Sequence, residues 1–198
     1  MSSGLGNSGV GEFLGELAAP TPIPAAGGAL ALTASTAAAL VEMTASISAA
    51  HPGGEIAPGR LAEIARASGR LRTEALALAE ADAIAYRQVL EAMALAEDDP
   101  ARAGRVRAAL SDAADPPLRL AEIGAEIADL AALIARNGRK SIRGDATVAA
   151  VLAEATCHAA AKVVEVNIGD AHDARVLAAA NLESAAALSR KRAVASDA

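Results

Sequence analysis

The residues whose types and spacing could do chemistry are two aspartates, Asp82 and Asp145, and a cluster of cations. Asp82 lies in a seam of mostly apolar residues at alternating spacings of three and four: Leu61, Ile64, Ser68, Leu71, Ala75, Leu78, Asp82, Ala85 and Val89. Such spacing places side chains along one face of a helix. A carboxylate on an apolar face must be paired, hydrogen-bonded or protonated, because burying a lone charge is costly. Asp82 is therefore a candidate acid/base group in a cleft. The alternative is that the helix curves and turns it toward solvent or an arginine.

The cation cluster lies in the stretch RNGRKSIRGD at 136–145 and comprises Arg136, Arg139, Lys140 and Arg143. Asn137 and Gly138 predict the end of one helix. Gly144 and Asp145 predict the start of the next, with Asp145 as its N-cap. The cations thus occupy an interhelical loop of a chain whose formal net charge is -6. Either they bind carboxylates or phosphates of a ligand, together with helix N-terminal amides, or they complement the preceding helix dipole and keep the loop soluble.

The composition determines the expected fold. Hydrophobic residues make up 53% of the chain and charged ones 21%, which excludes disorder as the main state. Only 1% is aromatic, so Ala, Leu, Val and Ile must fill the core, and such small side chains favour closely packed helices over a sheet. Proline- and glycine-containing breaks predict helices at 9–18, 28–49, 58–97, 100–114, 117–136, 146–167 and 171–192. The sequence predicts an all-α, single-domain bundle of about seven helices, one of them long, over 9–198. A flexible tail is expected at 1–8.

Two of these helices have a predicted inward face. In 117–136 the inward residues are Leu120, Ile123, Ile127, Leu130 and Ile134, opposite a solvated acidic row of Glu122, Glu126 and Asp129. In 146–167 they are Val148, Leu152, Ala155, Ala159, Val163 and Val166. His158 and Lys162 lie one turn apart beside that second row. We expect Lys162 at the surface, and His158 either at the surface or lining a pocket.

Several function classes are disfavoured. A pI of about 5.1 and the lack of aromatic stacking platforms argue against nucleic-acid binding. The uncharged stretch 25–41 is only weakly apolar, so it is interpreted as a buried helix and no membrane span is expected. A lone cysteine, Cys157, and the absence of a secretory leader pattern fit a cytoplasmic protein, with Cys157 a small packing residue. The histidines and Cys157 show no metal-ligand spacing, so no metal site is expected.

Longer stretches carry a further signal. They are EFLGELAAPTPIPAAGGALALTASTAAALVEMTA, ADAIAYRQVLEAM, DPPLRLAEIGAEI and ARNGRKSIRGDATVAAVLAEATCHAAAKVVEVNI. Together they resemble the cyclodeaminase/cyclohydrolase family of folate one-carbon metabolism, over most of the chain. In that family a proline precedes a glycine-rich turn and a small-residue helix, and a late Gly-Asn region precedes an Asp that starts a helix with an Asn near its end. The corresponding residues here are Pro24, Gly27, Gly28, Asp82, Asp145 and Asn167.

The resemblance implies an all-helical homodimer that acts on a tetrahydrofolate derivative as substrate, with no tightly bound cofactor. The expected activity is that of a methenyltetrahydrofolate cyclohydrolase, which converts 5,10-methenyltetrahydrofolate to 10-formyltetrahydrofolate, or of a formiminotetrahydrofolate cyclodeaminase. Asp82 and Asp145 are then the catalytic candidates, in a cleft where the glycine turn, the long helix and the Asp145 loop converge. The substrate-binding candidates are Pro24, Gly27, Gly28, Asn137, Gly138, Arg139, Lys140, Arg143 and Asn167, with the cations contacting an anionic glutamyl tail.

Two other hypotheses stay open. The family's run of glycines and a serine after the proline appears here as Ala25, Ala26, Gly27, Gly28 and Ala29, and added methyl groups can reshape a site that needs close backbone approach. This motivates a repurposed enzyme that cyclises, deaminates or hydrolyses a non-folate compound. The third hypothesis is a non-catalytic helical binding protein, in which Asp82 is a cost to stability.

Overall fold

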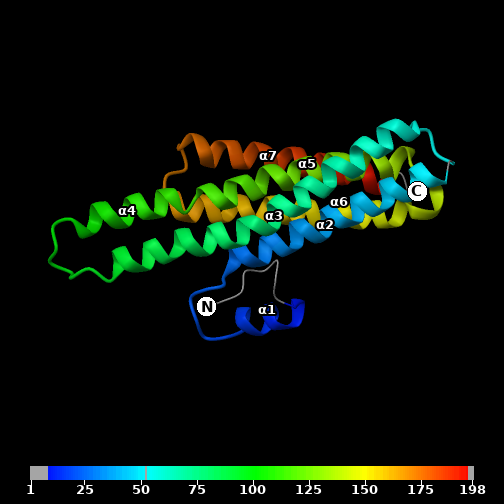
Figure 1. The fold of residues 1–198 in the computed structure, drawn as a ribbon. Coiled ribbons are helices and arrows are strands. Elements are labelled where there is room, and N and C mark those ends of the chain that lie inside the picture. The colour runs from blue at the N-terminus through cyan, green and yellow to red at the C-terminus, as the bar shows by residue number, and fades with distance from the viewer. Residues whose placement is uncertain (1–8, 52, 196–198) are drawn as a thin grey trace.

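The computed structural model describes residues 9–51 and 53–195, and in these ranges it is helical without any strand (Figure 1). The helices are α1 (Val10–Leu17), α2 (Ala26–Ala50), α3 (Pro58–Met93), α4 (Arg102–Asp112), α5 (Asp115–Asn137), the 3-10 helix η1 (Lys140–Ile142), α6 (Arg143–Ile168) and α7 (Ala174–Val194). The predicted all-α single-domain bundle is confirmed, and each predicted α-helix is present. The tail predicted at 1–8 lies outside the described residues.

Most of the helices run along a common axis. Figure 1 shows α2, α3, α5, α6 and α7 as a bundle, with α1 outside it beside the start of α2. The long helix α3 has 36 residues, which corresponds to about 54 Å at about 1.5 Å per residue. Helix α4 packs on α3 and leads into α5. The two ends of the bundle are therefore far apart. A residue can contribute only to a site at the end where its part of the helix lies.

Alanine fills most of the core, as the low aromatic content predicts. The buried residues of α2, α5 and α6 are largely alanines. At Gly124 in α5 a Cβ would lie 3.0 Å from the carbonyl oxygen of Ala153 in α6, so the two backbones nearly touch. Four of the five residues predicted to face inward from α5 are confirmed as fully buried, since Leu120, Ile123, Ile127 and Ile134 are each 0% exposed, and the fifth, Leu130, is partly buried against the core. Close helix contact here depends on small side chains.

The predicted inward face of α6 is wrong for three of its six residues, whereas Leu152, Ala159 and Val163 are partly buried against the core. Val148 is 51% exposed and Val166 is 68% exposed, and Ala155 is exposed as well. The buried row instead consists mostly of small residues: Ala146, Ala149, Ala150, Ala153, Thr156, Cys157, Ala160, Ala161 and Val164. The valines misled the prediction because they are the more hydrophobic residues, whereas the tight contacts of α6 with α2 and α5 admit mainly small side chains. An apolar row is consequently left on the outer side of α6.

The predicted N-cap is also wrong. Helix α6 begins at Arg143, directly after η1, and its N-cap position is Ile142 without a side-chain hydrogen bond. Asp145 lies inside the first turn, where its charge still complements the helix dipole. The basic stretch is therefore partly helical, and the interhelical loop is shorter than the sequence predicted.

By length and composition, α2 and the segment Lys140–Ile168 could each cross a membrane. Core helices of water-soluble proteins satisfy the same criterion, and 44% of the most apolar window of each is buried inside the bundle. This observation is weak evidence for a membrane span.

Candidate active site

A cavity of about 550 Å³ lies where the first turn of α2, the later part of α3 and the last third of α6 meet. Its size is in the range of small-molecule sites. The lining is mostly apolar, with a few polar groups. It comprises Ala25, Ala26, Gly27, Asp82, Tyr86, Ala113, His158, Ala159, Lys162, Val163, Val166 and Asn167. The structure thus brings together Gly27, Asp82 and Asn167 from the residues predicted to form the site.

Asp82 is the acidic group of this cavity. Its side chain is partly buried, and burial raises the pKa of the carboxyl above its ordinary value of 3.8. In the described chain no neighbouring charge or hydrogen bond offsets that shift. Of the alternatives considered for the seam of α3, a carboxyl group in a cleft is the one observed. Such a group holds its proton more readily than an exposed aspartate, which suits a proton donor.

Gly27 makes room for Asp82. A Cβ built on Gly27 would lie 2.1 Å from Cγ of Asp82 and 2.2 Å from both carboxylate oxygens, so no larger residue fits there without displacing the aspartate. Gly27 belongs to the first turn of α2, whose backbone N–H groups have no partner within the helix. The carboxyl group therefore lies beside the first turn of α2, whose N–H groups are available to bind anionic groups of a ligand.

Gly28 and Pro24 have a different position. A Cβ on Gly28 would lie 3.2 Å from Cζ of Phe13 and 3.5 Å from Cβ of Pro24. The missing side chain of Gly28 thus lets the buried ring of Phe13 dock α1 against α2. The Ile23–Pro24 peptide bond is cis. Neither Gly28 nor Pro24 lines the cavity, and both support the turn that carries Gly27.

Asn167 closes the end of the cavity. Its side-chain amide donates a hydrogen bond of 2.8 Å to the carbonyl oxygen of Ala113, between α4 and α5. This contact ties the last turn of α6 to that corner of the bundle. Gly169, which follows, ends α6 in the left-handed conformation with φ of 69°. Asn167 therefore both lines the cavity and holds its wall in place.

Tyr86, His158 and Lys162 also line the cavity, although they were not among the predicted site residues. Lys162 is exposed, as predicted, and donates to Glu165 at 2.7 Å. The sequence did not decide whether His158 lies at the surface or lines a pocket. The structure shows both, because the ring is exposed and also lines the edge of the cavity. The signal that could have found them is spacing, since Tyr86 follows Asp82 by one turn of α3 and Lys162 follows His158 by one turn of α6.

Cys157 is adjacent to His158 but takes no part in the cavity. The thiol is buried, and burial together with the charges of Glu183 and Glu154 raises its pKa to about 12. A thiol that stays protonated is a poor nucleophile. The interpretation of Cys157 as a packing residue agrees with this. No group of His, Cys, Asp or Glu suited to hold a metal ion is found in the described ranges.

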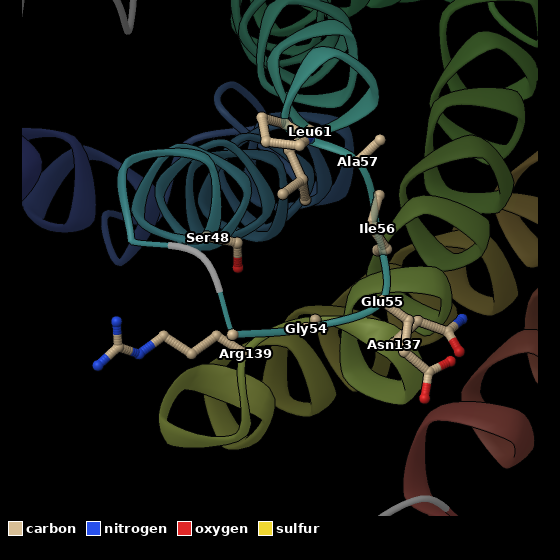
Figure 2. Close-up of a pocket in the computed structure, with 11 residues that line it drawn as sticks. Ser48, Gly54, Glu55, Ile56, Ala57, Leu61, Asn137 and Arg139 are labelled. Atoms are coloured by element: carbon tan, nitrogen blue, oxygen red, sulfur yellow. The ribbon is translucent and has the colours of Figure 1, made fainter.

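Asn137, Gly138 and Arg139 line a different cavity, of about 250 Å³, formed with Ser48 and the segment 53–58. There the amide of Glu55 donates to the carbonyl oxygen of Asn137 at 2.7 Å. In Figure 2 the guanidinium of Arg139 points away from the lining. It donates to Ser141 Oγ at 2.9 Å and to the carbonyl oxygen of His51 at 3.4 Å.

The other predicted cations do not meet the Asp82 cavity either. Arg143 donates to the carbonyl oxygen of Gly138 at 3.1 Å, and Lys140 is exposed. Asp145 is exposed near the start of α6, whereas Asn167 lies near its end, about 33 Å away at about 1.5 Å per residue. The predicted single cleft that unites Asp82 with the Asp145 loop does not exist within one chain.

The fold and the cavity define an all-helical protein with a small-molecule pocket built around one carboxyl group. The family model for formiminotransferase-cyclodeaminase matches residues 9–186, and the chain belongs to this family. A solved structure described as a formiminotetrahydrofolate cyclodeaminase from Thermotoga maritima matches with a TM-score of 0.85 and 23% identity, covering 95% of this chain and 94% of that one. This likeness shows a shared fold. No curated protein matches the sequence.

Proposed function

We propose that the protein cyclises formiminotetrahydrofolate to 5,10-methenyltetrahydrofolate with release of ammonia. Family membership supports a folate-related cyclodeaminase-like protein. The observation that carries the proposal is Asp82, a partly buried carboxyl group with a raised pKa, held against Gly27 in a largely apolar cavity. The substrate is a tetrahydrofolate derivative, and the reaction needs no tightly bound cofactor.

The reaction requires two proton transfers around one carbon. Substrate N10 attacks the formimino carbon, which forms the new C–N bond and leaves N10 with a proton to lose. The formimino nitrogen, which enters the reaction protonated as =NH2⁺, must gain one more proton before its bond to that carbon breaks and ammonia leaves. In our proposal Asp82 donates the proton to the departing nitrogen, since its raised pKa keeps it protonated to higher pH than an exposed aspartate. A well-placed acid contributes a factor of about 100 to 10,000.

The same bonds are involved in methenyltetrahydrofolate hydrolysis, in which water adds to the bridging carbon. Deamination is supported over this alternative by the likeness to a solved structure that is described as a formiminotetrahydrofolate cyclodeaminase. Deamination also needs no positioned water molecule, because the attacking nitrogen N10 is already tethered within the substrate. Release of ammonia from formiminotetrahydrofolate, against formation of 10-formyltetrahydrofolate from the methenyl compound, distinguishes the two activities.

We propose that the functional unit is a homodimer that completes the site. Within one chain Asp145 and the cations at 139–143 lie about 33 Å from the end of α6 that lines the cavity. Exposed apolar residues extend along α6 between these ends, and α2, which packs on α6, adds exposed Met43. A two-fold axis perpendicular to α6 pairs this face with itself and reverses the helix direction. The partner subunit's Asp145 then approaches the Asp82 cavity.

In this arrangement the cations at 139–143 of one subunit face the cavity mouth of the other. Their charge then binds the anionic glutamyl tail of the substrate, while the partner subunit's Asp145 stabilises the cationic formimino group. The test is the oligomeric state in solution together with activity. A stable dimer that loses both assembly and turnover when Val148 and Val151 are changed to Asp supports the arrangement. A fully active monomer contradicts it.

A further inference from the structure

A histidine–carboxylate pair lies at the mouth of the Asp82 cavity. His158 of α6 and Glu183 of α7 approach each other at 2.6 Å between Nδ1 and Oε1. The His158 ring lines the cavity, and its side chain is 69% exposed. The pair thus lies at the edge of the cavity, on the outer side of α6.

The charged residues next to His158 on α6 are paired with residues other than Glu183. Glu154, one turn before His158, forms an ion pair with Arg190 at 2.8 Å. Lys162, one turn after it, is paired with Glu165. From α3, across the cavity, the titratable groups are Asp82 and Tyr86. Among the residues described, His158 is the ion-pair partner of Glu183.

This geometry defines what the ring can do. When Glu183 accepts the hydrogen bond of Nδ1–H, Nε2 is the remaining nitrogen of the ring and the tautomer is fixed. A carboxylate in this position orients an imidazole and stabilises the imidazolium that forms when Nε2 takes up a proton. The protein's other histidines differ, since His172 is 96% exposed and 3.6 Å from Asp170, and His51 lies beyond the far end of α2.

We propose that His158, positioned by Glu183, is the second proton-transfer residue of this site. The inference rests on the function proposed above. As substrate N10 bonds to the formimino carbon, Nε2 of His158 takes the N10 proton, while Asp82 gives its proton to the departing nitrogen and the C–N bond to ammonia breaks. Asp82 is then a carboxylate and His158 an imidazolium, so one proton returned from His158 to Asp82 through water restores both groups.

The first experiment measures turnover of formiminotetrahydrofolate. His158→Gln should lower kcat by about 100-fold or more with little change in KM, as expected for loss of a general base. Glu183→Gln, which removes a positioning residue, should lower kcat by about 10 to 100-fold and alter the pH profile of kcat/KM, and Glu183→Asp should restore part of the loss. His172→Gln is the matched control and should behave as wild type. Unchanged kcat in His158→Gln overturns the inference and leaves the function proposed for Asp82 intact.

The second experiment needs no turnover. The chain has 3 histidines, so selective nitrogen labelling gives a small set of imidazole signals that variants assign. Adding 5-formyltetrahydrofolate, which cannot release ammonia, should shift the His158 signals and leave those of His51 and His172 in place. Binding without a shift at His158 overturns the inference. A wild-type protein that neither binds the compound nor turns over the substrate overturns both the inference and the proposed function.

Discussion

The α-carbon of Gly27 lies directly against the carboxylate of Asp82, with room for a hydrogen atom and nothing larger. This contact joins the first turn of α2 to α3, so the position of the acidic group depends on how closely the two helices approach. It also separates the roles of the two adjacent glycines, because Gly28 accommodates Phe13 rather than the cavity. Gly27 is therefore the glycine that the site itself requires.

Replacing Gly27 by Ala should displace Asp82 and reduce kcat by about 100-fold or more, the contribution of a positioned general acid. The physical reason is the distance of 2.1 Å from the added Cβ to Cγ of Asp82. Steady-state ammonia release measures the effect. Gly104→Ala is the control, since a Cβ there meets nothing within 4 Å. Wild-type kcat in Gly27→Ala would show that the Asp82 position is unimportant for turnover.

Asp82→Asn should make the protein more stable at neutral pH while it lowers kcat by about 100-fold or more. Burial raises the folded-state pKa of Asp82 above 3.8, so its contribution to stability is fully present below that value and is lost as pH rises through the folded pKa. Asn carries no charge and avoids this loss. Urea unfolding at a series of pH values should show wild type losing more stability with rising pH than the variant. If the free energy of unfolding changed with pH in the same way for both proteins, burial of Asp82 would not raise its pKa as proposed.

Mixing two inactive variants tests the shared site. Asp82→Asn and Asp145→Asn should each be inactive as homodimers, and refolding them together should restore about a quarter of wild-type activity. Half of a statistical mixture is heterodimer, and one site of each heterodimer then holds both aspartates. Differently tagged subunits verify that heterodimers have formed. Heterodimers without activity would exclude the partner subunit's Asp145 from the Asp82 site.

Removing the loop cations should weaken binding of the anionic tail. In the combined variant Arg139→Ala, Lys140→Ala and Arg143→Ala, KM should rise more for a polyglutamylated substrate than for the monoglutamate. The rise of KM with salt should also become shallower, because exposed charge interactions are screened. Arg70→Ala, an exposed cation in the middle of α3, is the control. An equal rise in KM for both substrates would mean that the cations do not bind the glutamyl tail and only keep the loop soluble.

Much of the fold could be predicted from the sequence. Proline and glycine breaks separated the helices, and the 3,4 spacing through Leu61, Ile64 and Leu71 identified the buried seam of α3. Asp82 was found because it interrupts that seam. The inward face of α6 was predicted only in part, because alanine carries little hydrophobic signal and close packing against α2 and α5 outweighed the greater apolarity of Val148 and Val166.

The site was harder to predict than the fold. A motif shows which residues accompany one another, but it does not show at which end of a long bundle each lies, so Asp145 was expected beside Asp82. Contacts between side chains of different helices could not be predicted either, because the pairing of His158 with Glu183 depends on how α6 and α7 pack. Residues that matter only through such packing leave no pattern in one sequence.

The most direct test of the account is ammonia release from formiminotetrahydrofolate by the purified protein, measured beside the appearance of the methenyl product and corrected for the spontaneous reaction. The account predicts equal amounts of both products with wild type, and loss of about 100-fold or more in kcat with Asp82→Asn. Asp98→Asn, a change at an exposed position between α3 and α4, is the control. Wild-type turnover by Asp82→Asn, or no turnover by the wild-type protein, would contradict the central claim.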